Sequence, residues 1–134
     1  PLVARCMRVH MWDEDHCRRV LTGYKQFLAI KKEKKDWYSK ELTPCPDVEK
    51  MWKEHICDMG NYWHDCQLLC GHVVTYNPDE AADENAKAHH LKNTAMALKA
   101  KFGARFDEDL WTSIGSPKGG WMARQSVKKV TKAV

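Results

Sequence analysis

Residues 48–79 read VEKMWKEHICDMGNYWHDCQLLCGHVVTYNPD, and this stretch decides the fold. It contains Trp52, Tyr62 and Trp63 together with three histidines and three cysteines, namely His55, His64, His72, Cys57, Cys66 and Cys70. A buried polar site needs such a density of aromatic and metal-competent side chains, and a tightly packed small core contains the same residue types. The stretch therefore predicts the architecture more firmly than it predicts an activity.

Two helices are expected within this stretch. The first begins near residue 47, stops near Gly60 and carries on one side Val48, Met51, Trp52, His55 and Met59. The second follows a cap at Asn61, ends at Gly71 and turns inward the side chains of Tyr62, Cys66, Leu69 and Cys70. Because Trp52 lies on the same helical side as Val48, we expect its indole to be an anchor of the core.

Two more helices are predicted before this stretch. Residues 2–10 suit one helical face, and Asp13 then caps a helix to about residue 30. The apolar positions of that helix repeat at three and four, through Cys17, Val20, Leu21, Tyr24, Phe27 and Leu28. Gly23 inside a helix costs up to about 1 kcal/mol, so we expect it at a close helix–helix contact. Residues 31–35, KKEKK, are predicted to be a solvated charge run.

A long helix is predicted over about 78–102. Asn77 is the expected N-cap, Pro78 takes the first helical position, and Glu80 completes a capping box. Apolar spacing of four and three runs through Glu84, Ala88, Leu91, Ala95, Leu98 and Phe102. Gly103 ends the helix, and residues 107–114 form a last short turn around Leu110 and Trp111.

Together these patterns predict an all-α, single compact domain of about five to six helices with one long capped helix and a basic C-terminal tail. We assign residues 1–115 to the helical domain and residues 116–134 to a linker and the tail. The net charge of +4 belongs to that tail, because residues 118–134 hold five of the 22 basic residues and none of the 18 acidic ones. The remaining 17 basic and 18 acidic residues give 1–117 a net charge of −1. A general nucleic-acid-binding face on the body is therefore not supported.

Six cysteines could form three disulfides in a secreted scaffold. However, Cys17, Cys66 and Cys70 fall on helical apolar stripes, where a free thiol packs as a small hydrophobe. Disulfide scaffolds are also usually shorter and rich in loops. We therefore expect reduced thiols and an intracellular protein, without an indication of the compartment. No apolar run approaches the roughly 20 residues that a transmembrane helix needs.

Several segments, taken in chain order, resemble one family. They are Tyr24 with Phe27 and Leu28, Leu42-Thr43-Pro44, Val48 with Trp52, His55-Ile56 and Asp58, Tyr62 with Asp65-Cys66, Asn77-Pro78, Thr94, and Phe102-Gly103. This order resembles the glycine-rich domain-containing protein-like family, whose members often read Trp-His-x-His-Ile-Leu-Asp and His-His-Asn-Pro. The resemblance covers roughly residues 1–111 and implies a helical fold more firmly than an activity.

The chain departs from the family pattern at its histidines. Lys53 stands where the family usually has the first histidine, and Thr75 and Tyr76 replace the paired histidines before Asn-Pro. If those histidines bind a metal in relatives, three nitrogen ligands are missing here. The positions that remain are His55, Asp58, Asp65 and Cys66.

A metal site could still be assembled from His55, Cys66, Cys70 and His72. Cys66 and Cys70 are one helical turn apart, and zinc accepts sulfur and nitrogen ligands. Usual zinc knuckles, however, have a two-residue gap between their cysteines. In the competing interpretation His55 is hydrogen-bonded to Asp58 or Asp65. It then belongs to a structural network without cofactor or catalytic residue, made of Trp52, His55, Asp58, Tyr62, Asp65 and Cys66.

The tail carries a separate hypothesis. Ala123, Val127, Val130 and Val134 repeat at helical spacing among the basic residues Arg124, Lys128, Lys129 and Lys132. Such a segment suits a protein partner, an anionic membrane surface or RNA phosphates. It can also remain a solubilising tail, or pack back onto the body through Trp121.

The leading hypothesis is a non-catalytic helical interaction or structural domain, an accessory or docking component of a larger assembly. The alternative is a metal-binding or metalloenzyme domain that holds zinc or iron through His55 with Cys66, Cys70 or His72.

Overall fold

The computed structural model describes residues 1–79 and 83–112. Over these ranges the chain is helical and contains no strand, which confirms the all-α prediction. In chain order the elements are α1 (Leu2–His10), α2 (Glu14–Lys34), α3 (Pro46–Cys57), α4 (Met59–Cys70), α5 (Glu84–Phe102), the 3₁₀ turn η2 (Gly103–Arg105) and α6 (Glu108–Thr112). None of these helices is long and apolar enough to cross a membrane.

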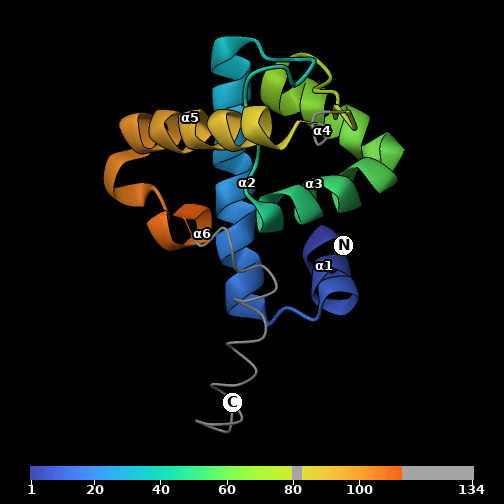
Figure 1. Ribbon diagram of the computed structural model, residues 1–134. Coiled ribbons are helices and arrows are strands. Elements are labelled where there is room, and N and C mark those ends of the chain that lie inside the picture. Colours follow the sequence, from blue (N-terminus) through green and yellow to red (C-terminus); the bar gives the residue numbers. More distant parts are fainter. Residues whose placement is uncertain (80–82, 113–134) are drawn as a thin grey trace, which may run out of the picture.

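Helix α2 is the centre of the fold (Figure 1). It contacts α1, α3, α4, α5 and α6. Figure 1 shows α5 crossing α2, with α3 and α4 together to one side and α6 at the other. The fully or nearly fully buried apolar side chains of α2 are Cys17, Val20, Tyr24, Phe27, Leu28 and Ile30. The apolar stripe predicted from the sequence therefore faces several helices at once.

The N-terminus of α2 forms as predicted, whereas its C-terminus differs. The Asp13 side chain accepts a hydrogen bond from the His16 amide at 2.8 Å and caps the helix. The helix continues to Lys34, beyond the predicted end near residue 30. Lys31 is fully buried, so the prediction of a solvated run over residues 31–35 is wrong at this residue. Lysine is rarely buried without a partner, and a partner is present in the following loop.

Lys31 and Asp36 form a buried ion pair that organises the loop after α2. Lys31 Nζ lies 2.9 Å from Asp36 Oδ2 and 5.1 Å from the centre of the Phe27 ring. The Asp36 carboxylate also accepts hydrogen bonds from the amides of Lys40 and Leu42. Burial alone would raise the pKa of Asp36, but the Lys31 ammonium and these amides outweigh burial and hold that pKa below its ordinary value.

Helices α3 and α4 follow one another almost without a break. Helix α3 ends at Cys57 and α4 begins at Met59, earlier than the predicted cap at Asn61. The Asn61 side chain instead donates a hydrogen bond to the Asp58 carboxylate at 2.8 Å. Gly71 ends α4 as predicted, with a φ of 74° that favours glycine.

Helix α5 begins later than the sequence suggested. Its cap is Asp83, whose carboxylate accepts hydrogen bonds from the amides of Asn85 and Ala86, both at 3.1 Å. The predicted cap Asn77 instead accepts a hydrogen bond from the Asp79 amide in a local turn. Glu80, the other half of the predicted capping box, lies outside the described residues. Two cap signals compete in this segment, and the one followed at once by the apolar stripe starts the helix.

Gly23 lies at a close contact between helices, as predicted. A Cβ atom at this position would stand 2.8 Å from Leu110 Cδ2 and 3.4 Å from Val48 Cγ2. The missing side chain therefore lets α6 approach α2, and Leu110 and Trp111 are both buried there. Arg19 and Asp107 add a two-pronged ion pair beside this contact, at 2.8 and 2.9 Å.

Candidate functional site

A chain of three polar side chains links α2, α3 and α4. The Tyr24 hydroxyl lies 2.8 Å from His55 Nδ1, and His55 Nε2 lies 2.8 Å from Asp65 Oδ2. Burial raises the pKa of Tyr24 well above its ordinary value, so the hydroxyl keeps its proton. Tyr24 is then the donor to Nδ1, and the Nε2–H group of His55 donates to Asp65. Both ring nitrogens of His55 are thus occupied within the protein.

A second hydrogen-bonded pair lies directly beside this chain. The Trp52 indole donates to the Tyr62 hydroxyl at 2.9 Å, and that hydroxyl donates to the Val74 carbonyl. The Tyr62 ring also packs edge-on against His55, with ring centres 4.9 Å apart. Burial raises the pKa of Tyr62, so this hydroxyl is neutral too. Trp52 is buried, as the sequence predicted.

Four members of the expected network thus touch one another, namely Trp52, His55, Tyr62 and Asp65. The Asp58 carboxylate instead accepts a hydrogen bond from the Asn61 side chain. Cys66 is buried on the inner side of α4. Arranged in this way, the polar groups connect α2, α3 and α4, and the two tyrosine hydroxyls keep their protons.

A cavity of about 500 Å³ lies against the polar chain. Tyr24, His55 and Asp65 line it on one side, and leucines from three helices line the rest, namely Leu2, Leu21, Leu28, Leu68 and Leu69. Exposed Lys25 and half-buried Arg5 and Asp58 border it as well. The cavity therefore combines aliphatic walls with a few charged groups, the composition typical of a surface that receives another apolar group.

The four candidate metal ligands are used in other ways. Cys70 donates a weak hydrogen bond to the Leu28 carbonyl at 3.9 Å, and burial raises the pKa of its thiol. His72 stacks on Trp37 with ring centres 4.7 Å apart, and its Nδ1 bonds the Val73 carbonyl. Among residues 1–79 and 83–112, no three His, Cys, Asp or Glu side chains form a group that could hold a metal ion. The alternative hypothesis of a metal site therefore finds no geometric support here.

Two of the positions that depart from the family's histidine pattern lie together in space. Lys53 Nζ stands 5.3 Å from the centre of the Tyr76 ring, close enough for a cation–π interaction. The Tyr76 hydroxyl donates a hydrogen bond to Glu49 at 2.7 Å. Thr75 pairs with the loop after α2, because its amide donates to the Trp37 carbonyl. Lys53, Thr75 and Tyr76 are therefore held in place by packing and hydrogen bonds to neighbouring residues.

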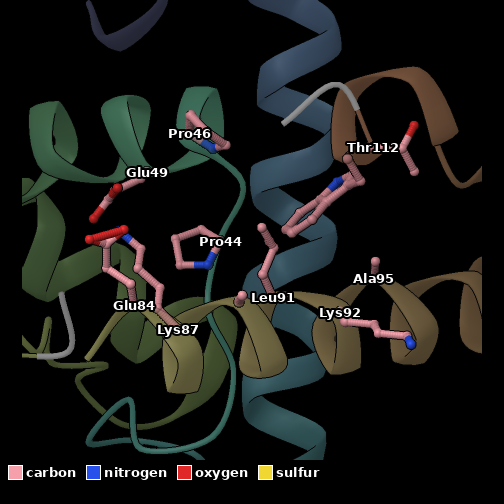
Figure 2. A pocket seen from close by; sticks show the side chains of 11 residues that line it. Pro44, Pro46, Glu49, Glu84, Lys87, Leu91, Lys92, Ala95 and Thr112 are labelled. Carbon is pink, nitrogen blue, oxygen red and sulfur yellow. The ribbon is translucent and has the colours of Figure 1, made fainter. Parts of the chain in front are cut away.

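A larger groove of about 710 Å³ lies between α3, α5 and α6 (Figure 2). Pro44, Pro46, Leu91, Ala95 and Trp111 contribute most of its apolar lining. Glu49, Glu84 and Lys87 stand at one end, and Lys92 and Thr112 stand at the other. Sequence reasoning missed this groove because its lining comes from three helices and the loop before α3, which no single apolar pattern brings together.

All six cysteines are free, in agreement with the expected thiols. The tail residues proposed to bind a partner, Arg124, Lys128, Lys129 and Lys132, lie outside the described residues. The same holds for the assigned boundary between the helical domain (1–115) and the linker and tail (116–134).

Comparison with family models gives one match. The model named Glycine-rich domain-containing protein-like covers residues 1–65, which end with Asp65 of the polar chain. Comparisons with curated proteins and with solved structures found no match. The resemblance that we inferred beyond residue 65 stays a prediction. Over residues 1–65 this chain is therefore similar to the glycine-rich domain-containing protein-like family, which supports the resemblance inferred from the sequence.

Proposed function

We propose that this chain is a non-catalytic helical interaction domain and serves as an accessory or docking component of a larger assembly. One observation carries the proposal, the apolar surface of α4. Four large apolar side chains of this twelve-residue helix are exposed, namely Met59 (75%), Trp63 (58%), Leu68 (71%) and Leu69 (49%). On the longer α5 only Met96 is a large apolar side chain with comparable exposure among the described residues. Single exposed apolar residues are ordinary, whereas a concentration of them marks an interaction surface.

The leucine-lined cavity extends this surface inward. Leu68 and Leu69 are exposed and also line the cavity, whereas Met59 and Trp63 lie on a different side of α4 from Leu68. An apolar side chain from a partner helix can therefore rest on α4 and enter the cavity between α1, α2 and α4. Recognition of this kind places anchors of an amphipathic helix in an apolar groove. The partner we propose is accordingly a protein.

The chemistry of the polar chain supports a structural role for it. A general base needs a free lone pair near a substrate, and a nucleophile needs an activating base. Both nitrogens of His55 already have hydrogen-bond partners, and the Tyr24 hydroxyl donates its hydrogen to one of them. Tyr62 likewise donates to a backbone carbonyl. We therefore assign positioning of α2, α3 and α4 to these residues and propose no catalytic role.

We also propose that the domain works without a metal cofactor and inside the cell. Reduced thiols suit an intracellular protein, and all six thiols here are free. Elemental analysis after mild purification tests the first part, with His55→Ala as the reference. One equivalent of zinc or iron that disappears in His55→Ala would favour the metalloprotein alternative.

The interaction surface is tested with two matched variants of the full chain. Leu68→Asp places a charge on the exposed side of α4, and Met96→Asp places the same charge on α5, where the side chain is also exposed (61%). Each chain carries a tag and is expressed in the source cells. The gently lysed cells are separated by size-exclusion chromatography, and the tagged chain is detected in the eluted fractions. The wild type and Met96→Asp are expected to elute with an assembly, and Leu68→Asp is expected to elute alone. Elution of all three chains as monomers, or of all three with the assembly, would count against α4 as the interface.

A further inference from the structure

The apolar stripe of α5 is covered along only half of its length. Its residues are Glu84, Ala88, Leu91, Ala95, Leu98 and Phe102. Leu98 is fully buried, whereas Leu91 and Ala95 are half-buried and Ala88 is exposed. A helical stripe of this kind normally faces other protein groups along its whole length. The described residues leave its N-terminal half facing the groove between α3, α5 and α6.

The end of α6 places the remaining chain at the edge of this groove. Thr112 is the last described residue, and it lines the groove (Figure 2). Helix α6 is held firmly, because Leu110 and Trp111 are buried beside Gly23 and Asp107 is paired with Arg19. Residues 113–134 therefore start from a fixed point on the groove wall. A segment tethered so closely reaches an effective concentration of about millimolar at that site.

The composition of residues 113–134 matches the groove. Their large apolar residues, Ile114, Trp121, Met122, Val127 and Val130, suit the lining of proline, leucine, alanine and tryptophan. The basic residues of this segment follow mainly after Trp121, and the segment has no acid. At the end of the groove away from Thr112 stand the carboxylates Glu49 and Glu84, with Lys87 beside them (Figure 2). A chain that runs from Thr112 along the groove thus brings Ile114, Trp121 and Met122 to the apolar centre first, and the basic residues with the valines between them reach the carboxylates afterwards.

We propose that residues 113–134 bind this groove in the same molecule, with Trp121 as the main apolar anchor. The cavity volume of about 710 Å³ lies within the range of roughly 300–1,000 Å³ that is usual for binding pockets. The bound segment covers the open half of the α5 stripe. This inference is independent of the α4 surface, because the two surfaces have no lining residue in common.

Photo-cross-linking of the full chain tests the proposal. A benzophenone amino acid replaces Trp121, the chain is irradiated, and cross-linked peptides are mapped by mass spectrometry. The expected products have the mass of one chain and join position 121 to peptides that contain residues 44–49 or 84–95. Ala88→Lys introduces an ammonium group at an exposed position in the groove, where it opposes both apolar contact and the basic residues of the segment, and the variant still folds. It should lower the cross-link yield about tenfold, as expected for a charge forced against apolar groups.

Met96→Lys is the matched control, because it introduces the same charge on an exposed part of α5 that does not line the groove. The control variant should give the same cross-link yield as the chain in which the groove is unchanged. Products with the mass of two chains would assign the groove to a second copy and overturn the proposal. Cross-links scattered over the surface, equally frequent in Ala88→Lys, would overturn it as well and leave the segment free for an acidic partner.

A second measurement uses hydrogen exchange in the full chain. Trp121→Ser removes the proposed anchor without touching the helical body. Amides of residues 84–95 should then exchange faster than in the wild type, while amides of α3 keep their rates. Identical exchange over residues 84–95 in the two chains would contradict binding of the segment to the groove.

Discussion

Helix α2 has two contrasting sides. Toward α3 and α4 it meets large side chains, and Phe27 packs edge-on against Trp52 with ring centres 5.4 Å apart. Toward α5 it meets a stripe rich in alanine, and beside Leu91 this helix borders the groove that stays open between α3, α5 and α6. Both helical neighbours were predicted from apolar periodicity. The side around Phe27 and Trp52 is closed, although a cavity of about 500 Å³ remains farther along between α1, α2 and α4. Periodicity therefore tells which side of a helix faces the core, and side-chain volume tells whether the space is filled.

The largest effect is expected on the closed side, at the buried ion pair. Asp36→Ala leaves the Lys31 ammonium buried without its counter-charge and removes the acceptor of several loop amides. Loss of one partner of a buried pair costs about 3–5 kcal/mol. The measurement is urea unfolding, with Lys34→Ala as the control because Lys34 is exposed. Equal midpoints for the two variants would show that the pair contributes nothing to the closed side.

The same ion pair predicts how stability depends on pH. The pKa of Asp36 in the folded chain lies below its ordinary value of 3.8, so the folded state binds the proton less readily than the unfolded state. The stabilisation is therefore complete above the ordinary pKa and is lost as the pH falls through the lowered pKa. Unfolding free energies measured from neutral to acid pH should decline less steeply in Asp36→Asn than in the wild type. Parallel curves would refute a role of Asp36 in the acid sensitivity of the fold.

The next prediction compares the substitution of a buried tryptophan with that of an exposed one. Trp52 is 1% exposed and contacts Phe27, Tyr62 and Tyr76, whereas Trp63 on α4 is 58% exposed. Trp52→Ala should cost about 3–5 kcal/mol, the usual result for a large aromatic side chain removed from a core. Trp63→Ala should stay within about 0.5 kcal/mol of the wild type in the isolated chain. Thermal melting of both variants is the test, and a Trp52→Ala melt close to wild type would contradict the closed-core assignment.

A smaller effect is expected for the polar chain between the helices. His55→Ala leaves the buried Tyr24 hydroxyl without its acceptor, at a cost of about 1–3 kcal/mol. Asp65→Asn is the milder partner variant, because the Asp65 side chain is 42% exposed and an amide oxygen still accepts the His55 N–H. Urea unfolding should rank His55→Ala below Asp65→Asn in stability. The reverse order would mean that the bond from His55 to Asp65 on α4 contributes more to stability than the bond from Tyr24 to His55.

Several structural features that depend on residues close together in the sequence were predicted correctly. The Asp13 cap, the Gly71 terminus, the Gly23 contact and the burial of Trp52 each follow from a residue type at a fixed place in a helical pattern. Lys31 was placed in solvent because the run KKEKK has the composition of a surface. Its burial depends on Asp36, which the chain brings back only after α2 has ended. The start of α5 was misplaced because Asn77 and Asp83 are both good caps, and tertiary packing chose between them.

The site was predictable to the same limited extent. The bond from His55 to Asp65 joins residues ten apart on successive helices, and the sequence left Asp58 as an equal choice. The Tyr24 hydroxyl, which completes the chain from α2, carries no sequence signal because Tyr24 sits in an ordinary apolar stripe. The groove needed the positions of three helices and could not be foreseen from any one of them.

The last effect concerns reactivity and leaves stability unchanged. Cys57 is the exposed cysteine, whereas Cys6, Cys17, Cys45, Cys66 and Cys70 are buried. Burial raises the pKa of Cys6 and of Cys45 to about 12, so few thiolates form at these positions even in mildly alkaline buffer. A water-soluble thiol reagent should therefore modify Cys57 rapidly in the native chain and the other five only on unfolding. Mass spectrometry counts the adducts, and Cys57→Ser should abolish the rapid phase. Rapid modification of Cys66 or Cys70 would show that the interface between α2 and α4 opens as readily as the groove beside α5, and the contrast between the two sides of α2 would fail.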